Sequence, residues 1–152
     1  KEVEVFYKCN AIIIPVSNLP TNAFYTPRQR YKADSLLVFQ KQLAKDGIRS
    51  VIGFTAKDIS TATPDWGVFG LGYCPGKACV ISTYRLKKAS VTTVQLKERL
   101  IKVVLHELGH NLGLPHCTFN KECLLTDAGG TIKQVDRERK WLCSKCTQIL
   151  HQ

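Results

Sequence analysis

The chain has 152 residues, 44% hydrophobic and 22% charged, which is ordinary for one compact soluble domain; no apolar run approaches the ~18 residues that a membrane span requires. The net charge of +10 raises the possibility of nucleic acid as a partner. The basic clusters at 28–32, 85–88 and 137–140 are short, dispersed and without a nucleic-acid-binding motif, so we expect solvated basic surfaces rather than a nucleic-acid partner.

The first half of the chain predicts strands around one helix. Residues 3–16 are rich in β-branched and aromatic side chains and predict a first strand. Residues 28–45 carry apolar side chains close to helical spacing, with Pro27 as a start signal and Gly47 as a stop signal. Further strands are predicted at 48–55, 66–73 and 78–84, with a glycine and a proline separating the last two.

The second half predicts two helices. Thr92 and Gln95 can form a capping box, and the apolar residues that follow indicate a largely buried helix that ends at Gly113. A last helix is predicted over 132–150. The order of elements indicates a single α/β (α+β) domain.

Three of the four histidines fall in the stretch HELGHNLGLPHC, which begins at His106. His106 and His110 are four residues apart and share a helix face, so both can reach one metal ion at ~2.0–2.1 Å. A turn at Gly113 can bring His116 back as a third ligand, which leaves the open fourth position that a catalytic zinc needs. Glu107 is rotated by about 100° from His106 and can act as a base without ligating.

The chain has seven cysteines, an odd number. The last four are spaced like metal ligands rather than like a disulfide framework: Cys117, Cys123, Cys143 and Cys146. A redox role for the C-x-x-C pair at 143–146 is disfavoured, because such pairs belong at a strand-to-helix turn of a βαβ unit. Cys74 and Cys79 flank a turn-like segment and can either pair or serve, like Cys9, as small apolar residues; we favour the second reading.

The motif H-E-x-x-H-x-x-G-x-x-H at 106–116 is that of the metzincin metallopeptidases, and the residues after it resemble the archaemetzincin family. In that family a cysteine directly follows the third histidine, and four cysteines bind a second, structural zinc. The seventeen residues between Leu125 and Cys143 also match the family pattern. Two features depart from it: five residues rather than four separate Cys117 from Cys123, and Leu125 occupies the position of the methionine that packs beneath the metal.

The resemblance implies a metzincin-like fold and two zinc ions per chain. The fold would have a twisted mixed β-sheet with a backing helix and an active-site helix, followed by a small subdomain with a helix and the structural zinc site. A single domain over 1–152 would then divide into an N-terminal subdomain, 1–113, and a C-terminal subdomain, 114–152. By analogy, residues 78–84 could form an exposed edge strand on which an extended peptide lies.

The activity implied is hydrolysis of peptide bonds in a peptide or protein substrate. Zinc held by the three histidines would lower the pKa of its water toward ~7 and polarise the scissile carbonyl. Glu107 would take the water's proton and pass it to the leaving amine. The alternative is an inactive zinc-supported module that binds peptide or nucleic acid, and the intact Glu107 argues against it.

We also expect a monomer without membrane association. A site of four thiolates suits the reducing cytoplasm. The chain starts at Lys1 and contains no methionine, which leaves export open.

Overall fold

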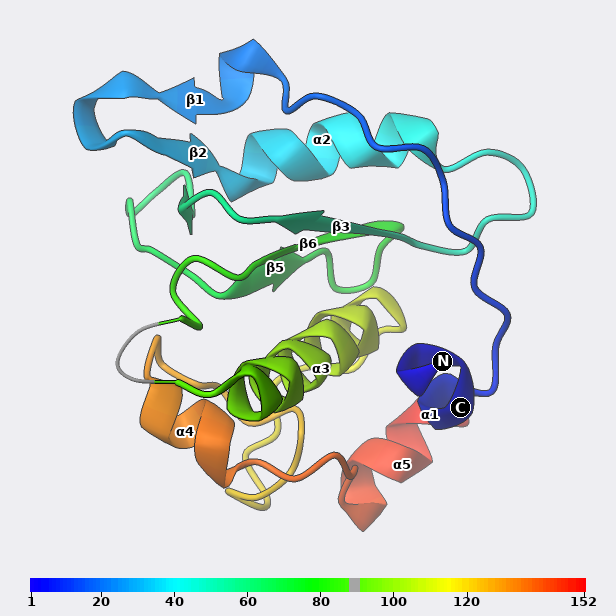
Figure 1. Cartoon of the computed structure of the whole chain (residues 1–152). Helices are drawn as coiled ribbons and strands as arrows, with labels where there is room; N and C mark the ends of the chain where they lie inside the picture. The colour runs from blue at the N-terminus through cyan, green and yellow to red at the C-terminus, as the bar shows by residue number, and fades with distance from the viewer. Residues whose placement is uncertain (88–90) are drawn as a thin grey trace.

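The computed structural model describes residues 1–87 and 91–152, and they form a layered α/β fold (Figure 1). The main sheet has the strand order β3-β6-β5. β3 (Val51–Thr55) runs parallel to β6 (Ala78–Ser82), and β5 (Gly70–Gly72) runs antiparallel to it. The sheet is therefore mixed, as predicted, and β6 is its central strand.

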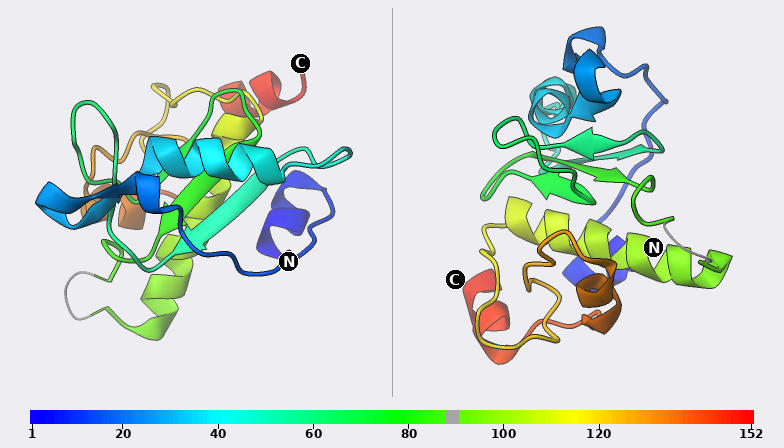
Figure 2. Two further views of the ribbon diagram at one scale, coloured as in Figure 1. Left: turned by 90° about the horizontal axis from the view of Figure 1, so that it is seen from above. Right: turned by 90° about the vertical axis from the view of Figure 1, so that its left-hand side faces the viewer.

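Two helices cover the two faces of this sheet, as Figure 2 shows from a second side. Because side chains alternate along a strand, β6 packs against both helices. On one face Ala78 and Val80 contact α2 (Ala33–Leu43) through Leu36 and Leu37. On the other face Cys79 and Ile81 pack in a cluster that lies against α3 (Thr93–Asn111) and includes Val103 and Val104 of that helix. This packing fixes α3, the predicted active-site helix, under the sheet.

A second, smaller sheet, which the sequence did not predict, has the order β1-β2-β4. Its strands are β1 (Phe24–Tyr25), β2 (Arg30–Lys32) and β4 (Ile59–Ser60). The helix predicted over 28–45 is thus shorter than expected, because Arg30–Lys32 pairs with strands on both sides before α2 begins.

Most of the basic clusters are ion-paired. Lys32 and Arg30 lie against Asp65, and Arg85 makes a close pair with Asp58. Lys140 similarly contacts Glu98. Lys88, part of the predicted cluster at 85–88, lies outside the described residues. Side chains engaged in this way present less free charge to nucleic acid than the sum of +10 suggests.

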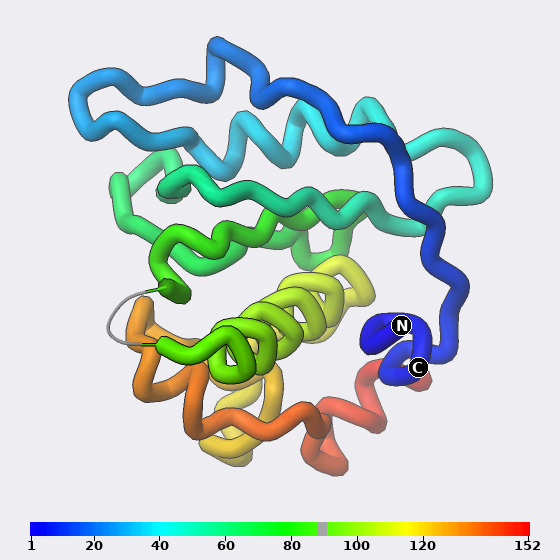
Figure 3. The backbone as a smooth tube through the Cα atoms, in the orientation of Figure 1, coloured from blue at the N-terminus to red at the C-terminus, as the bar shows by residue number. Residues whose placement is uncertain are grey.

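The first strand predicted, over 3–16, is wrong: the chain begins with helix α1 (Glu2–Tyr7) and continues without regular structure to residue 20. Val3, Phe6 and Tyr7 have the i, i+3, i+4 spacing of a helix face and pack on the cluster around Leu105. The Tyr7 hydroxyl donates a hydrogen bond to the Leu105 carbonyl at 2.6 Å. The segment after α1 runs past the sheet toward β1 (Figure 3).

The single helix predicted over 132–150 is two helices, α4 (Ile132–Arg137) and α5 (Ser144–Leu150). Between them the backbone pairs with the preceding loop: Arg139 N–H donates to Glu122 O at 2.8 Å, and Leu124 N–H donates to Trp141 O at 2.9 Å. These bonds replace the helical ones and turn the chain back toward α3. No helix of the described residues is long and apolar enough to cross a membrane.

Candidate metal centres

The second half of α3 and the turn after it bring three histidines together. The capping box predicted at Thr92 and Gln95 starts the helix. Gly113 ends it with a φ of +93°, which favours glycine and redirects the chain. One donor nitrogen of each imidazole of His106, His110 and His116 lies within 4.8 Å of the others.

Backbone acceptors orient the two helical imidazoles. The Nδ1 atoms of His106 and His110 each lie 2.7 Å from a carbonyl oxygen, that of Leu124 and that of Leu114 respectively. A carbonyl only accepts, so both Nδ1 atoms carry the proton and both Nε2 atoms present a lone pair. Burial is the main cause that lowers the pKa of His106 to about 3, which keeps it in the neutral form that metals bind.

The spacing of these nitrogens suits a zinc ion. The Nε2 atoms of His106 and His110 are 3.0 Å apart. Two nitrogens at ~2.05 Å from one tetrahedral ion would lie ~3.3 Å apart, so small movements complete the geometry. Two lone pairs that face each other at this distance repel, because no hydrogen lies between them. A cation bound by both nitrogens would remove this repulsion.

Glu107 lies beside this cluster and against the sheet. Its side chain is 8% exposed and packs on the backbone of Gly70: a Cβ placed there would lie 2.7 Å from Glu107 Cγ. Burial raises the pKa of the Glu107 carboxyl to about 8, and a hydrogen bond with the Gly72 backbone lowers it. A cation on the neighbouring histidines would favour the ionised carboxylate that a base requires.

The three histidines and Glu107 line a cleft of about 390 Å³. One wall is formed by β5 with Val68 and Phe69, and the opposite side includes Val103, Val135 and Glu138. β5, like β3, is an edge strand of the main sheet, whereas the predicted edge strand, 78–84, contains the central β6, whose residues are all buried. The prediction of 78–84 as an exposed edge is therefore wrong, and β5 offers the free edge beside Glu107.

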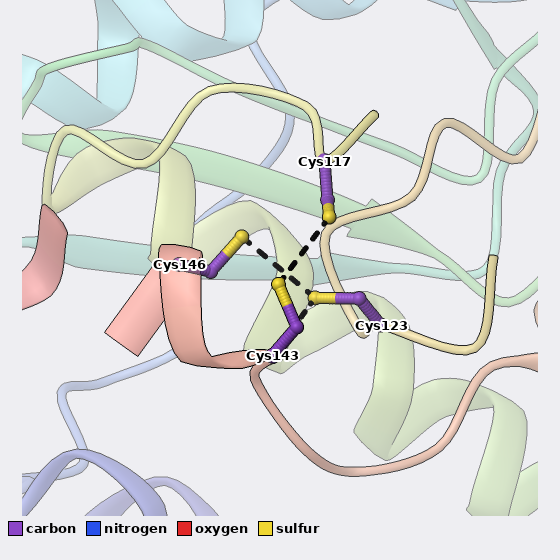
Figure 4. Close-up of side chains that lie close together, drawn as sticks. All are labelled: Cys117, Cys123, Cys143 and Cys146. Atoms are coloured by element: carbon purple, nitrogen blue, oxygen red, sulfur yellow. Dashed lines mark hydrogen bonds between the residues drawn. The ribbon is translucent and has the colours of Figure 1, made fainter. Parts of the chain in front are cut away.

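The four C-terminal cysteines form a second cluster, with their sulfur atoms directed toward one another (Figure 4). The Sγ atoms of Cys117 and Cys143 are 3.7 Å apart, and those of Cys123 and Cys146 are 3.8 Å apart. Four sulfurs at ~2.3 Å from a tetrahedral zinc ion would be ~3.8 Å apart, whereas a disulfide would bring two of them to ~2.05 Å. The donor set and its spacing thus fit a closed zinc site.

The other three cysteines are free thiols. Cys79 belongs to β6 and is buried in the core between this strand and α3, whereas Cys9 and Cys74 are exposed. The alternative of a Cys74–Cys79 disulfide is therefore wrong. Cys74 lies at the cleft, and its thiol donates to the Leu114 carbonyl at 3.4 Å.

Comparison with known proteins identifies the family. The profile described as Peptidase family M54 matches residues 3–152. The chain belongs to peptidase family M54. An archaemetzincin from Haloquadratum walsbyi is 32% identical, over 95% of this chain and 85% of the relative.

Solved structures of archaemetzincins have a similar fold. The crystal structure of an archaemetzincin from Methanopyrus kandleri is 32% identical, with a TM-score of 0.78 over 88% of this chain and 71% of that one. An archaemetzincin from Archaeoglobus fulgidus, crystallised with malonate, is 26% identical, with a TM-score of 0.83 over 97% of this chain and 86% of that one. The chain is thus a zinc metallopeptidase of the archaemetzincin type, a hydrolase.

Leu125, predicted from the sequence to take the position of the methionine beneath the metal, lies under α3. It is 0% exposed, and its methyl carbons come within 3.2 and 3.4 Å of the Cβ position of Gly109, between the two helical histidines. Because leucine and methionine have similar volumes, Leu125→Met should change the free energy of unfolding by less than ~1.5 kcal/mol, and Leu125→Ala should lower it by ~2–5 kcal/mol. Urea unfolding of the three proteins measures both.

Turnover provides the second check on Leu125. If leucine preserves the floor of the M54 site, Leu125→Met changes kcat by less than about tenfold. A gain of about a hundredfold would mean ~2.7 kcal/mol of additional transition-state stabilisation and would contradict the equivalence of the two side chains.

Other residues of this M54 site were not predicted from the sequence. Asn111, at the end of α3, donates hydrogen bonds of 2.9 Å to the carbonyls of both Tyr73 and Ala78 and so ties the helix to the sheet. Gly70 and Gly72 allow the close approach of Glu107 to β5. Glycines inside a predicted strand often mark such an approach, so their presence in 66–73 could have indicated this contact. Glu138 lies within a run of charged residues, so nothing in the sequence indicated that its side chain is buried in the cleft.

Proposed function

We propose that the chain hydrolyses peptide bonds in the cleft between β5 and α3, with His106, His110 and His116 as ligands of a catalytic zinc and Glu107 as general base. One observation carries this proposal: a buried carboxylate lies next to two imidazoles whose unprotonated nitrogens face each other, and both line a cleft beside a free strand edge. Zinc, when bound there, supplies a Lewis acid that acidifies water and polarises a carbonyl.

The chain's own residues account for proton transfer and positioning. Glu107 takes a proton from the attacking water and delivers it to the leaving amine. The Gly72 backbone and the close packing on Gly70 hold its carboxylate in place. The carbonyls of Leu114 and Leu124 keep the helical imidazoles in the tautomer that presents Nε2 to the metal.

The substrate would bind as an extended peptide along the free edge of β5. A strand edge offers backbone donors and acceptors to any extended chain, and side chains on alternate residues then enter the cleft. β5 has this edge because β6 pairs with its other side. The proposal replaces residues 78–84 by 70–72 as the substrate strand.

The remaining assignments concern the rest of the molecule. We propose that Cys117, Cys123, Cys143 and Cys146 bind a structural zinc and that the chain acts as a monomer. A four-thiolate site supports a reducing compartment such as the cytoplasm. The division of one domain at residue 113 stays a prediction. α3 ends close to this point, at Asn111, but α1 from the N-terminal part packs against the C-terminal part.

The test combines metal analysis with a peptide-library cleavage assay. Two zinc ions per chain and cleavage products in mass spectrometry are expected, with activity lost on chelation and regained with zinc. A protein that binds both zinc ions but leaves every peptide intact would support the binding-module alternative instead.

A further inference from the structure

Beyond the histidines, the cleft contains a buried acid that the proposed mechanism does not use. Glu138, just after α4, lines the same cleft as Glu107 and is 4% exposed. Val103, one turn before His106 on α3, also lines the cleft. The cleft therefore extends from the histidines along α3 to Val135 and Glu138.

The Glu138 carboxylate has little to compensate its burial. Within residues 1–87 and 91–152 no basic nitrogen forms an ion pair with it. The one side-chain hydrogen bond that the described part of the chain gives it is long, 3.5 Å from Gln134 Nε2, and that amide also donates to Lys121 O at 2.9 Å. A buried carboxylate without a cation is costly, so such a group suggests a ligand that supplies one.

Three cations near Glu138 are engaged elsewhere. Lys102 Nζ donates to the carbonyls of Val135 and Asp136 at 2.9 and 3.1 Å. Arg99 makes a two-point contact with the Asp136 carboxylate at 2.7 Å. Arg139, the next residue in the chain, is paired with Glu122.

A second acid increases the negative potential of the cleft. Asp127 is exposed and lines the cleft together with Glu138. Burial raises the pKa of Glu138 to about 7, and the charge of Asp127 raises it as well, whereas Gln134 and Lys102 lower it. The walls between these acids and the histidines are apolar, which suits the aliphatic stem of a long cationic side chain.

We propose that this cleft binds a lysine or arginine side chain of the substrate residue next to the scissile bond, with Glu138 as its ion-pair partner and Asp127 at the entrance. The proposal rests on the proposed peptidase function and adds the class of substrate. The methylene stem would lie against Val103 and Val135, and the charged end would reach Glu138.

The first test compares peptides that differ only by lysine or norleucine beside the cleaved bond. Wild type should cleave the lysine peptide with a kcat/KM at least about tenfold higher, the range expected of a buried charge-assisted contact. Glu138→Gln should abolish this difference, so that both peptides are cleaved with the same kcat/KM. Glu2→Gln, which makes the same change at an exposed acid outside the cleft, is the matched control and should keep the preference.

A binding measurement separates this inference from the peptidase function. The Kd values of both peptides are measured by calorimetry on zinc-loaded Glu107→Gln protein, with and without Glu138→Gln. Lysine-selective binding that Glu138→Gln removes supports the inference even if no peptide is cleaved. Equal binding of both peptides, or a lysine preference that survives Glu138→Gln, overturns it even if the enzyme is active.

Asp127→Asn provides a variant that does not touch a buried group. It should reduce the lysine preference by about two- to threefold, the effect of an exposed charge. If Glu138→Gln proves unstable in thermal unfolding, this variant decides: an unchanged lysine preference in Asp127→Asn contradicts the proposed site.

Discussion

Glu107→Gln should lower kcat by a factor of ~10²–10⁴, because glutamine keeps the size of the side chain but cannot accept the proton of the attacking water. The zinc content should stay at two ions per chain, since Glu107 is not a proposed ligand. Single-turnover cleavage of one optimised peptide, together with metal analysis of the same samples, measures both quantities.

Glu122→Gln serves as the control, because it makes the same chemical change at an exposed position whose carboxylate, among the residues that the structure describes, pairs with Arg139 alone. Activity retained within about tenfold in Glu107→Gln would assign the proton transfer to another group. A parallel loss of zinc would show that the carboxylate supports the metal centre rather than the proton transfer.

Gly70→Ala tests the position of the same carboxylate, because the new methyl group would project from the sheet toward Glu107. The added methyl would lie 2.7–3.0 Å from the Glu107 side chain, which is flexible and can move aside. The fold should therefore persist while kcat falls. Gly72→Ala is the contrasting variant, since its methyl would meet the Glu107 backbone oxygen at 2.7 Å and should lower the melting temperature instead.

The parts of the site that could be predicted from the sequence depend on spacing along one element. Histidines four residues apart on a capped helix share a face in any fold, and a glycine at the helix end permits the turn that returns His116. The spacing of Cys117, Cys123, Cys143 and Cys146 indicated metal ligands, whereas their union in one structural zinc site was implied by the family resemblance, which already contains the tertiary fold.

The parts that could not be predicted depend on packing between distant segments. Val3, Phe6 and Tyr7 fit a strand by residue type, but their contacts with the Leu105 cluster select a helix. The order of β5 and β6 was also open, although the unbroken apolar run of β6 is typical of a strand buried on both faces. Glu138 reaches the cleft only because the backbone between α4 and α5 pairs with the loop at 122–124.

The cysteine cluster and the histidine cluster share this loop, so the structural zinc should also position the catalytic one. Cys123 directly precedes Leu124, whose carbonyl accepts the hydrogen bond from His106 Nδ1 and whose N–H donates to Trp141 O. Loss of the cluster frees the loop and thereby the backbone acceptor that orients His106. Changes to such supporting contacts typically lower metal affinity or activity by ~10–100-fold.

Cys143→Ser is therefore expected to reduce bound zinc from two ions to one, to weaken the remaining site by ~10–100-fold and to destabilise the protein. A structural zinc is worth ~10–16 kcal/mol in small zinc-dependent folds, and a loss of only ~4 kcal/mol would lower the melting temperature of a chain of this size by ~8–16 °C. Metal analysis, competition with a zinc chelator and thermal unfolding measure the three effects.

Cys9→Ser makes the same substitution at an exposed thiol outside the cluster and should change none of them. If Cys143→Ser kept both zinc ions and the wild-type melting temperature, the cluster would not be a metal site. If it lost one zinc ion but left the affinity of the histidine site unchanged, the structural site would exist, but the loop through Leu124 would not couple it to the catalytic centre. The competition with a zinc chelator therefore decides whether the two sites are coupled, because the zinc affinity of the histidine site depends on the His106 hydrogen bond rather than on the stability of the fold.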